Sequence, residues 1–250
     1  MCMQVDQKNF LTDRGSGNPH SSSRGVSWLV EMITRRHFLS APALALRAAP
    51  PRVTVFRTGE GGYHTCRIPA IVLTKRKTLV AFCEARKDNA RDSGNIDLVV
   101  KRSADGGKTW SPLQVVADLG GDTIGNPAPV VERKTGRLLL PLTRNPGQIT
   151  EKQIRSREPG ATRTVWLTAS DDDGVTWKPV ADITATTKDP DWNWYATGPG
   201  NGIQTRRGRL VIAHTQDAAT RERRDHPGKI VLCIPGEMAF GTGDHATTAT

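Results

Sequence analysis

Two short segments, SADGGKTW at residues 103–110 and SDDDGVTW at residues 170–177, decide the fold expected for this chain. Both fit the pattern S-x-D-x-G-x-T-W, the Asp box. The positions that define the two boxes are Ser103, Asp105, Gly107, Thr109 and Trp110, and Ser170, Asp172, Gly174, Thr176 and Trp177. Because the motif closes two similar stretches of sequence, it indicates an internal structural repeat.

The residue types of the box predict a structural turn. Ser and Asp side chains hydrogen-bond to the backbone of turns, and glycine adopts the positive φ that a tight hairpin requires. A Trp at the end of each copy predicts an anchor that buries a large apolar face between sheets. Asp-rich loops also bind calcium, but these boxes carry few carboxylates. We therefore predict structural boxes and no metal site.

Short β-rich runs alternate with turn residues from Val53 to about Thr215. The segment PAIV at residues 69–72 recurs as PAPV at residues 127–130, and each copy precedes a turn and a Leu-bearing strand. We expect strands at 67–73, 78–85, 96–103 and 110–117, then at 128–132, 137–143, 164–170 and 177–183, then at 202–205 and 209–215. Radial repetition of four-stranded sheets is typical of a β-propeller, so the expected fold class is all-β.

Several further segments resemble exo-α-sialidases of the Asp-box (BNR-repeat) family. They include YHTCRIP at 63–69, with an Arg-Ile-Pro motif, LVAFCEAR at 79–86, RDSGNIDL at 91–98, GNPAPV at 125–130 and WYATGPGNGIQ at 194–204. The resemblance covers about residues 53–217. It implies part of a six-bladed propeller, with about two and a half blades of antiparallel sheet within residues 52–217.

The resemblance also implies roles for individual residues. Arg67 matches an arginine that binds the carboxylate of sialic acid, which a planar guanidinium can hold with two parallel hydrogen bonds. Arg86 matches an arginine near the ring hydroxyls, and Asp92 matches the general acid and base. Asn126 is a further candidate for substrate binding. Asp88 and Asp97 are alternatives to Asp92, and we expect Asp97, which lies within a β-rich run, to be structural.

The implied activity is release of terminal sialic acid from sialylated glycoconjugates by retaining hydrolysis, with a tyrosine nucleophile and no cofactor. The sequence departs from the family here. Tyr63 and Tyr195 are its only tyrosines, and neither lies in the nucleophile's sequence context. The matching region also stops partway through the third repeat. We therefore expect a truncated chain that is inactive by itself. The alternative is a non-catalytic propeller fragment that binds glycans or has a structural role.

The composition excludes some classes of function. The net charge is +10, which could favour nucleic acid through displacement of phosphate counterions. However, the basic residues are scattered, and no basic stripe is interleaved with aromatic residues, so we expect no nucleic-acid partner. No stretch approaches the ~18 apolar residues of a membrane span. The pair Cys66 and Cys83 on neighbouring strands could form a disulfide, but two buried free thiols are favoured.

The two ends of the chain differ from its middle. Residues 1–31 are polar and predict a disordered extension. Residues 32–51 begin MITRRHFLS, and this pairing of arginines with an Ala- and Leu-rich run resembles a bacterial twin-arginine signal. It implies export to the periplasm or the medium, with translation starting at Met32.

Residues 218–250 do not resemble a propeller. The segment PGEMAFGTGDHATT at 235–248 resembles a glycine-rich segment of methyltransferases that modify a ribosomal protein, with Glu237 as an extra residue. In that family the segment lies near the S-adenosylmethionine site. A low-complexity tail is the alternative interpretation, and we expect no methyl transfer from so short a segment.

Overall fold

The computed structural model describes residues 4–6, 52–198, 200–216 and 229–234. All of the predicted polar extension except residues 4–6, and the whole of the predicted twin-arginine region, lie outside this described part. So does most of the tail that resembles a methyltransferase segment. Near the start, β1 (Gln4–Asp6) and β2 (Arg52–Thr54) form a two-stranded sheet.

The first sheet contains β3 (Thr65–Leu73), β4 (Leu79–Arg86), β5 (Ile96–Ser103) and β6 (Gln114–Ala117). Each strand pairs antiparallel with the next one along the chain. All eight residues of β4 are buried, because apolar side chains pack against both faces of this sheet. Such a strand is a rigid support for the polar side chains at its end.

The second sheet repeats this arrangement with an interrupted first strand. Two short segments, β7 (Thr123–Gly125) and β8 (Val130–Val131), both pair with β9 (Leu138–Asn145). The sheet continues antiparallel through β10 (Thr164–Ser170) to β11 (Ala181–Asp182). One parallel pairing, between β5 and β7, joins the first two sheets.

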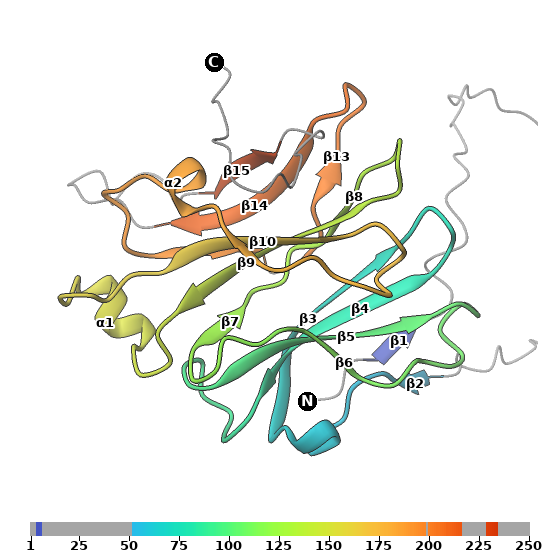
Figure 1. The fold of residues 1–250 in the computed structure, drawn as a ribbon, viewed down its shortest axis with the longest axis horizontal. Coiled ribbons are helices and arrows are strands. Elements are labelled where there is room, and N and C mark those ends of the chain that lie inside the picture. The colour runs from blue at the N-terminus through green and yellow to red at the C-terminus, as the bar shows by residue number, and fades with distance from the viewer. Residues whose placement is uncertain (1–3, 7–51, 199, 217–228, 235–250) are drawn as a thin grey trace, which may run out of the picture. The chain divides into compact units, whose positions relative to one another are not determined.

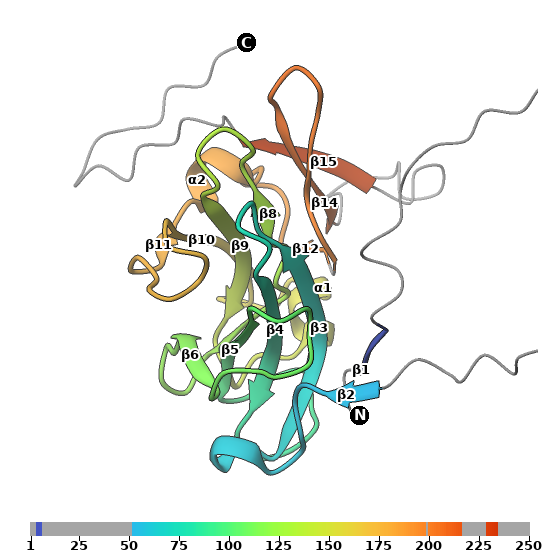
Figure 2. The same cartoon turned by 90° about the vertical axis from the view of Figure 1, so that its right-hand side faces the viewer.

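The third sheet follows the same order (Figures 1 and 2). Its first strand is again divided, into β12 (Tyr195–Thr197) and β13 (Ile203–Gln204), and both parts pair with β14 (Leu210–Gln216). Then β15 (Lys229–Ile234), which lies within the predicted tail, pairs antiparallel with β14. The repeated meander of sheets confirms the predicted all-β class.

Helical segments are few in the described residues. They are the 3-10 turn η1 (Glu60–Gly62), α1 (Glu151–Arg155) and α2 (Thr184–Thr187). Thr150 and Gln153 cap the start of α1 reciprocally, which satisfies backbone N–H groups that have no partner within the helix. No helix in the described part is long and apolar enough to cross a membrane.

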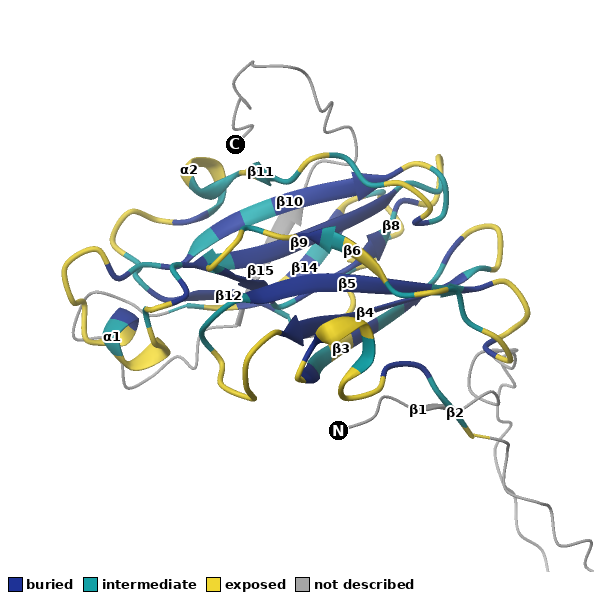
Figure 3. Cartoon of the chain, turned by 60° about the horizontal axis from the view of Figure 1, so that its bottom comes forward, coloured by how far each residue is buried: buried dark blue, intermediate teal, exposed yellow. Residues whose placement is uncertain are grey.

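Most residues of the long strands are buried (Figure 3), and apolar side chains form layers between successive sheets. Phe82, Leu98 and Val100 of the first sheet pack with Leu140 and Leu142 of the second. A similar cluster joins the second sheet to the third. Each fully buried Leu or Phe side chain stabilises the fold by about 1.5–3 kcal/mol, so these layers hold neighbouring sheets in register.

The opposite face of the first sheet is covered differently. The small side chains Ala81, Cys83 and Ala85 of β4 pack beneath Phe56 and Tyr63, which come from the segment before β3. Both aromatic residues are buried. This segment therefore closes the face of the first sheet that points away from the second sheet.

Both Asp boxes have the same hydrogen-bond pattern. The Ser103 hydroxyl donates to Asp105 Oδ1 at 2.7 Å and accepts from the Gly107 N–H at 2.8 Å. The Thr109 hydroxyl and N–H both donate to Asp105. These bonds, led by those from Thr109, lower the pKa of Asp105 well below its usual value. The carboxylate oxygens thus serve the turn itself.

The second box repeats these bonds through Ser170, Asp172 and Thr176. Its Trp177 lies edge-on to Phe82 of the first sheet, with ring centroids 5.5 Å apart. This Trp therefore joins two sheets, as the sequence predicted for the Trp of a box. Among the described residues, no three His, Cys, Asp or Glu side chains form a group that could hold a metal.

Candidate active site

Three of the predicted site residues meet at one carboxylate. Asp92 Oδ1 lies 2.8 Å from Arg67 Nη1 and 2.7 Å from Arg86 Nη2. Arg86 is buried, whereas 67% of the Asp92 side chain and 38% of the Arg67 side chain are exposed. The site therefore has a buried guanidinium, a partly exposed guanidinium, and an exposed carboxylate between them.

Arg86 also fixes the loop that carries Asp92. Its Nη1 donates to the carbonyl oxygens of Ala90 and Arg91, both at 2.7 Å. The Asn89 side chain accepts from the Arg91 N–H at 2.9 Å, which is the local bond that Asn commonly makes in turns. The loop between β4 and β5 therefore presents Asp92 from a backbone held by a buried arginine.

Glu84 balances the charge of Arg86 and connects two sheets. Its Oε2 accepts from Arg86 Nη2 at 2.8 Å, and its Oε1 accepts from the Asn126 N–H at 3.0 Å. Glu84 is buried, and a buried charge needs such partners. The adjacent Gly125 leaves room for it, because a Cβ there would lie 2.8 Å from Glu84 Cγ.

Two non-glycine residues beside these groups have positive φ. Ile68 has φ 51°, in the bulge that interrupts the β3–β4 pairing between Arg67 and Ala70, and Asn126 has φ 52°. Positive φ is uncommon for β-branched residues such as Ile. Strained backbone of this kind clusters at functional sites. In this chain the strain sets the positions from which Arg67 and Asn126 project.

These elements surround a pocket of about 230 Å³. Its charged end contains Glu84, Arg86 and Asp92. The lining is completed by Ile68, Thr123, Gly125, Asn126, Thr143, Glu151, Arg163, Trp194 and Ala196. Asn126 is held by its Nδ2, which donates to Thr143 Oγ1 at 3.0 Å. The pocket is small, polar at one end and aromatic at the other.

Arg163 and Trp194 form the aromatic end of the pocket. The Arg163 guanidinium lies 4.1 Å from the centroid of the Trp194 ring, and its Nε donates to Asn145 Oδ1 at 3.2 Å. Arg155 lies 4.2 Å from the same ring. Burial lowers the pKa of Arg163 to about 10, so the group remains cationic at neutral pH.

The tyrosines of the chain do not line this pocket. Tyr63 is buried and donates to Asp97 Oδ2 at 2.6 Å. Burial, together with that bond, raises the pKa of Tyr63 above its usual value. Tyr195 is fully buried and stacks on His214, with ring centroids 4.5 Å apart. Asp97 is itself fully buried, so it cannot reach a substrate as Asp92 can.

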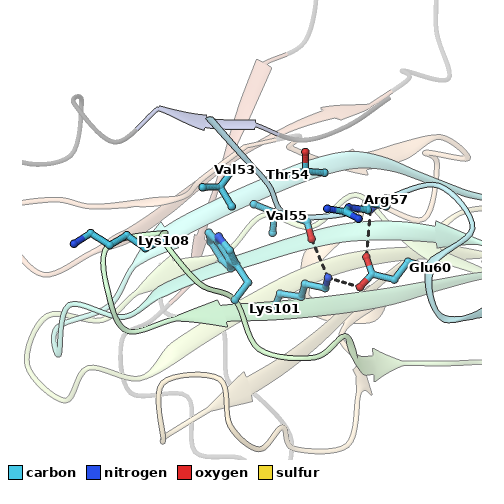
Figure 4. Close-up of a pocket in the computed structure, with 8 residues that line it drawn as sticks. Val53, Thr54, Val55, Arg57, Glu60, Lys101 and Lys108 are labelled. Atoms are coloured by element: carbon cyan, nitrogen blue, oxygen red, sulfur yellow. Dashed lines mark hydrogen bonds and ion pairs between the residues drawn. The ribbon is translucent and has the colours of Figure 1, made fainter. Parts of the chain in front are cut away.

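A second pocket, of about 400 Å³, lies where the segment before β3 covers the first sheet (Figure 4). The buried Lys101 donates to the Val55 carbonyl at 2.9 Å and forms an ion pair with Glu60. Trp110 of the first Asp box and Arg57 also line it. This pocket contains none of the predicted site residues.

The structure places Arg86, Asp92 and Asn126 in the lining of one pocket, and Arg67, which does not line that pocket, contacts Asp92. Sequence reasoning missed Glu84 and Arg163. Glu84 could have been found, because an acidic residue inside a strand that is otherwise small and apolar needs a buried partner. Arg163 and Trp194 are separated in sequence, and no local pattern links them.

Two of these sheets carry an Asp box, and the sheets together line a pocket that contains arginines and carboxylates. This combination is typical of a propeller of the BNR-repeat class. The family model described as BNR repeat-like domain matches residues 77–233. The chain belongs to this family.

Among curated relatives, the exo-alpha-sialidase of Aspergillus fumigatus is 38% identical over 173 residues, covering 60% of this chain and 41% of that protein. The exo-alpha-sialidase of Arthroderma benhamiae is 37% identical over 166 residues, with the same coverage. Sialidase-2 of Mus musculus is 34% identical over 207 residues, covering 78% of this chain and 52% of the mouse protein. The chain thus spans about half the length of these relatives or less.

Solved structures of sialidases and trans-sialidases have a similar fold. The Hadza microbial sialidase Hz136 superposes with a TM-score of 0.61 at 27% identity, covering 75% of this chain and 41% of that one. The intramolecular trans-sialidase of Ruminococcus gnavus superposes with a TM-score of 0.58 at 14% identity, covering 72% and 62%. These likenesses confirm a partial sialidase-type propeller.

Proposed function

We propose that this chain forms the part of an exo-α-sialidase site that binds the sialic acid carboxylate and carries the general acid. The observation that carries the proposal is the convergence of Arg67 and Arg86 on one oxygen of Asp92. A guanidinium that already holds a carboxylate, and is partly exposed, is suited to hold the carboxylate of a ligand.

Binding then proceeds by exchange of carboxylates. The substrate carboxylate replaces Asp92 at Arg67, and planar geometry allows two parallel hydrogen bonds. Arg86 does not bind the substrate carboxylate in this exchange, because its guanidinium already donates hydrogen bonds to Glu84 and to the carbonyl oxygens of Ala90 and Arg91. Its role is to keep the Asp92 loop beside the sugar.

In the reaction of the family, the residue that Asp92 matches protonates the leaving oxygen and afterwards serves as base for the incoming water, and we assign that position to Asp92. Its exposure and its position in a loop support this role, since the side chain can turn toward a bound glycoside.

Retaining sialidases use a tyrosine nucleophile, an exception among glycosidases. Both tyrosines of this chain are buried outside the pocket. We therefore propose that the 250-residue chain binds sialylated glycans without cleaving them.

The test is binding of the purified chain to immobilised sialylated glycans and to their desialylated counterparts. We expect binding to the sialylated set alone, and loss of that binding in Arg67→Ala. Arg76→Ala is the matched control, because Arg76 is exposed in the turn between β3 and β4, at the far end of the strands. Equal retention of Arg67→Ala and the native chain would contradict the proposal.

The same preparation is incubated with a sialyllactose, and free sialic acid is measured. We expect none above the level of a buffer control. Release that survives in the native chain and disappears in Asp92→Asn would contradict the proposed lack of turnover while supporting the role of Asp92. Release by both forms would instead indicate a contaminating enzyme, which is removed by further purification before the comparison is repeated.

A further inference from the structure

Cys66 on β3 and Cys83 on β4 lie directly behind the candidate active site. Both thiols are free and buried, with 5% and 1% of their surface exposed. They belong to one apolar cluster with Val55 and Phe56, on the face of the first sheet that points away from the second sheet. No step of the proposed sialidase chemistry uses them.

Each cysteine is the neighbour in sequence of a residue of the candidate active site. Arg67 follows Cys66, Glu84 follows Cys83, and Arg67 is directly opposite Glu84 in the register. Successive side chains of a strand point to opposite faces, so the two cysteines occupy the back of the pair that carries the site. The pairing skips between Arg67 and Ala70, which leaves Cys83 opposite the bulge.

The two thiols lie on paired strands, with Cys66 opposite Ala85, two residues from Cys83, and the pKa values of the two thiols are shifted in opposite directions. Cys83 donates a hydrogen bond to Cys66, and this bond lowers the pKa of Cys66 against the opposing effect of burial. Burial, followed by the same bond, raises the pKa of Cys83. Of the charged groups nearby, the Lys101 ammonium favours the Cys66 thiolate and Glu60 opposes it. Cys66 is therefore the nucleophile of the pair, since the thiolate is the reactive form.

We propose that Cys66 and Cys83 are a redox-active dithiol that a peroxide converts to a disulfide, joining β3 to β4 behind Arg67 and Glu84. The Cys66 thiolate attacks one peroxide oxygen, the O–O bond breaks, and a sulfenic acid forms with release of hydroxide. The Cys83 sulfur then attacks Cys66, the S–S bond forms, and a second hydroxide leaves. The two thiol protons and two hydroxides make two waters, so two thiols are oxidised and one peroxide is reduced.

The pocket of Figure 4 lies beside the apolar cluster that contains this pair, and we infer that a small oxidant enters there. Val55 lines that pocket and packs in the same cluster as both cysteines, and Trp110 also belongs to both. Lys101, whose charge favours the Cys66 thiolate, extends from the pocket wall. A peroxide is small enough to use such a route, whereas a bulky disulfide is not, because Cys66 is almost fully buried.

The experiment treats the reduced full chain with hydrogen peroxide, blocks remaining thiols with an alkylating reagent under denaturing conditions, and maps the peptides by mass spectrometry. We expect a cross-linked peptide pair containing Cys66 and Cys83, lighter by two hydrogen atoms. A linked loop of this length should raise the melting temperature by about 6–12 °C. Cys66 and Cys83 that both stay alkylatable, or a Cys66 sulfinic acid without a cross-link, would overturn the proposal.

Two variants make the result specific. The variant Cys2→Ser/Cys233→Ser removes the two cysteines outside the pair. The cross-link and the thermal shift are expected to persist in it, because Cys66 and Cys83 are both kept. In Cys83→Ser, peroxide should no longer raise the melting temperature. If Cys83→Ser does not fold, the peptide map of the native chain still decides the question. None of these measurements depends on sialic acid, so the proposal can fail independently of the proposed function.

Discussion

Asp92 holds one carboxylate oxygen 2.8 Å from Nη1 of Arg67, the arginine assigned to the substrate carboxylate. The Asp92 carboxylate therefore occupies the position on Arg67 where the ligand carboxylate is expected to bind. Because the pair is largely exposed, the contact is worth only about 0.2–1 kcal/mol. A ligand that makes two parallel bonds to the guanidinium can displace it.

Removing this internal competitor should tighten binding of the ligand. We predict that Asp92→Ala binds free sialic acid about two- to fivefold more tightly than the native chain, as expected from loss of an exposed ion pair. Isothermal titration calorimetry measures the change. Asp88→Ala, in the same exposed loop, is the control and should leave the affinity unchanged. Weaker binding by Asp92→Ala would mean that Asp92 contacts the ligand and does not compete with it.

Glu84 should be important for stability, because it neutralises a buried guanidinium. Glu84→Gln removes the buried carboxylate partner of Arg86 and leaves only the exposed Asp92, and breaking a buried pair in this way costs about 3–5 kcal/mol. Urea denaturation should show that loss in the free energy of unfolding. Glu151→Gln removes the exposed Glu151–Arg155 pair and should cost less than about 1 kcal/mol. Similar losses in both variants would contradict this role for Glu84.

The close approach of Glu84 to Gly125 allows a second stability test. A methyl group at residue 125 would overlap the Glu84 side chain, so Gly125→Ala should destabilise the chain by about 1–3 kcal/mol. It should also weaken sialic acid binding, because Glu84 positions Arg86 and Asn126. Gly121→Ala has open space around its added methyl group and is the matched control. An unchanged melting temperature in Gly125→Ala would show that Glu84 can move without consequence.

Asp105 should link the fold to pH. Hydrogen bonds from Thr109 lower the folded-state pKa of Asp105, so the ionised form stabilises the folded chain. That contribution is complete above the unfolded pKa of about 3.9, and it is lost as the pH falls through the folded-state pKa. We predict that Asp105→Asn lowers the urea midpoint at pH 6, and that its deficit shrinks as the pH falls below about 4. A deficit independent of pH would contradict the assignment, and Asp191→Asn should show no deficit.

The sequence predicted the long strands well and the short ones poorly. Residues 96–103 and 164–170 were predicted with the bounds of β5 and β10, because an Asp box ends each strand. The runs at 110–117 and 177–183 are strands only at 114–117 and 181–182. Pro112 and Pro179 lie in the missing parts, and proline cannot donate a ladder hydrogen bond.

The third sheet and the back of the site were harder to anticipate. The strand β12 has three residues, too few to show a period of two, and it was missed. Its neighbour Trp194 meets Arg163 only through the pairing of distant segments. By contrast, Arg67, Arg86 and Asp92 lie in short motifs near the ends of β3, β4 and β5, and the resemblance to the sialidase family rests on those motifs.

The central claim is that Arg67 recognises a carboxylate, and the most direct measurement compares two ligands with the native chain. Free sialic acid and its methyl ester are titrated in parallel, with binding followed by calorimetry or by NMR. We predict that the ester, which lacks the negative charge, binds at least about tenfold more weakly, as expected for loss of a charge-assisted pair. Equal affinity for the acid and the ester would contradict the assignment of Arg67 and the function built on it.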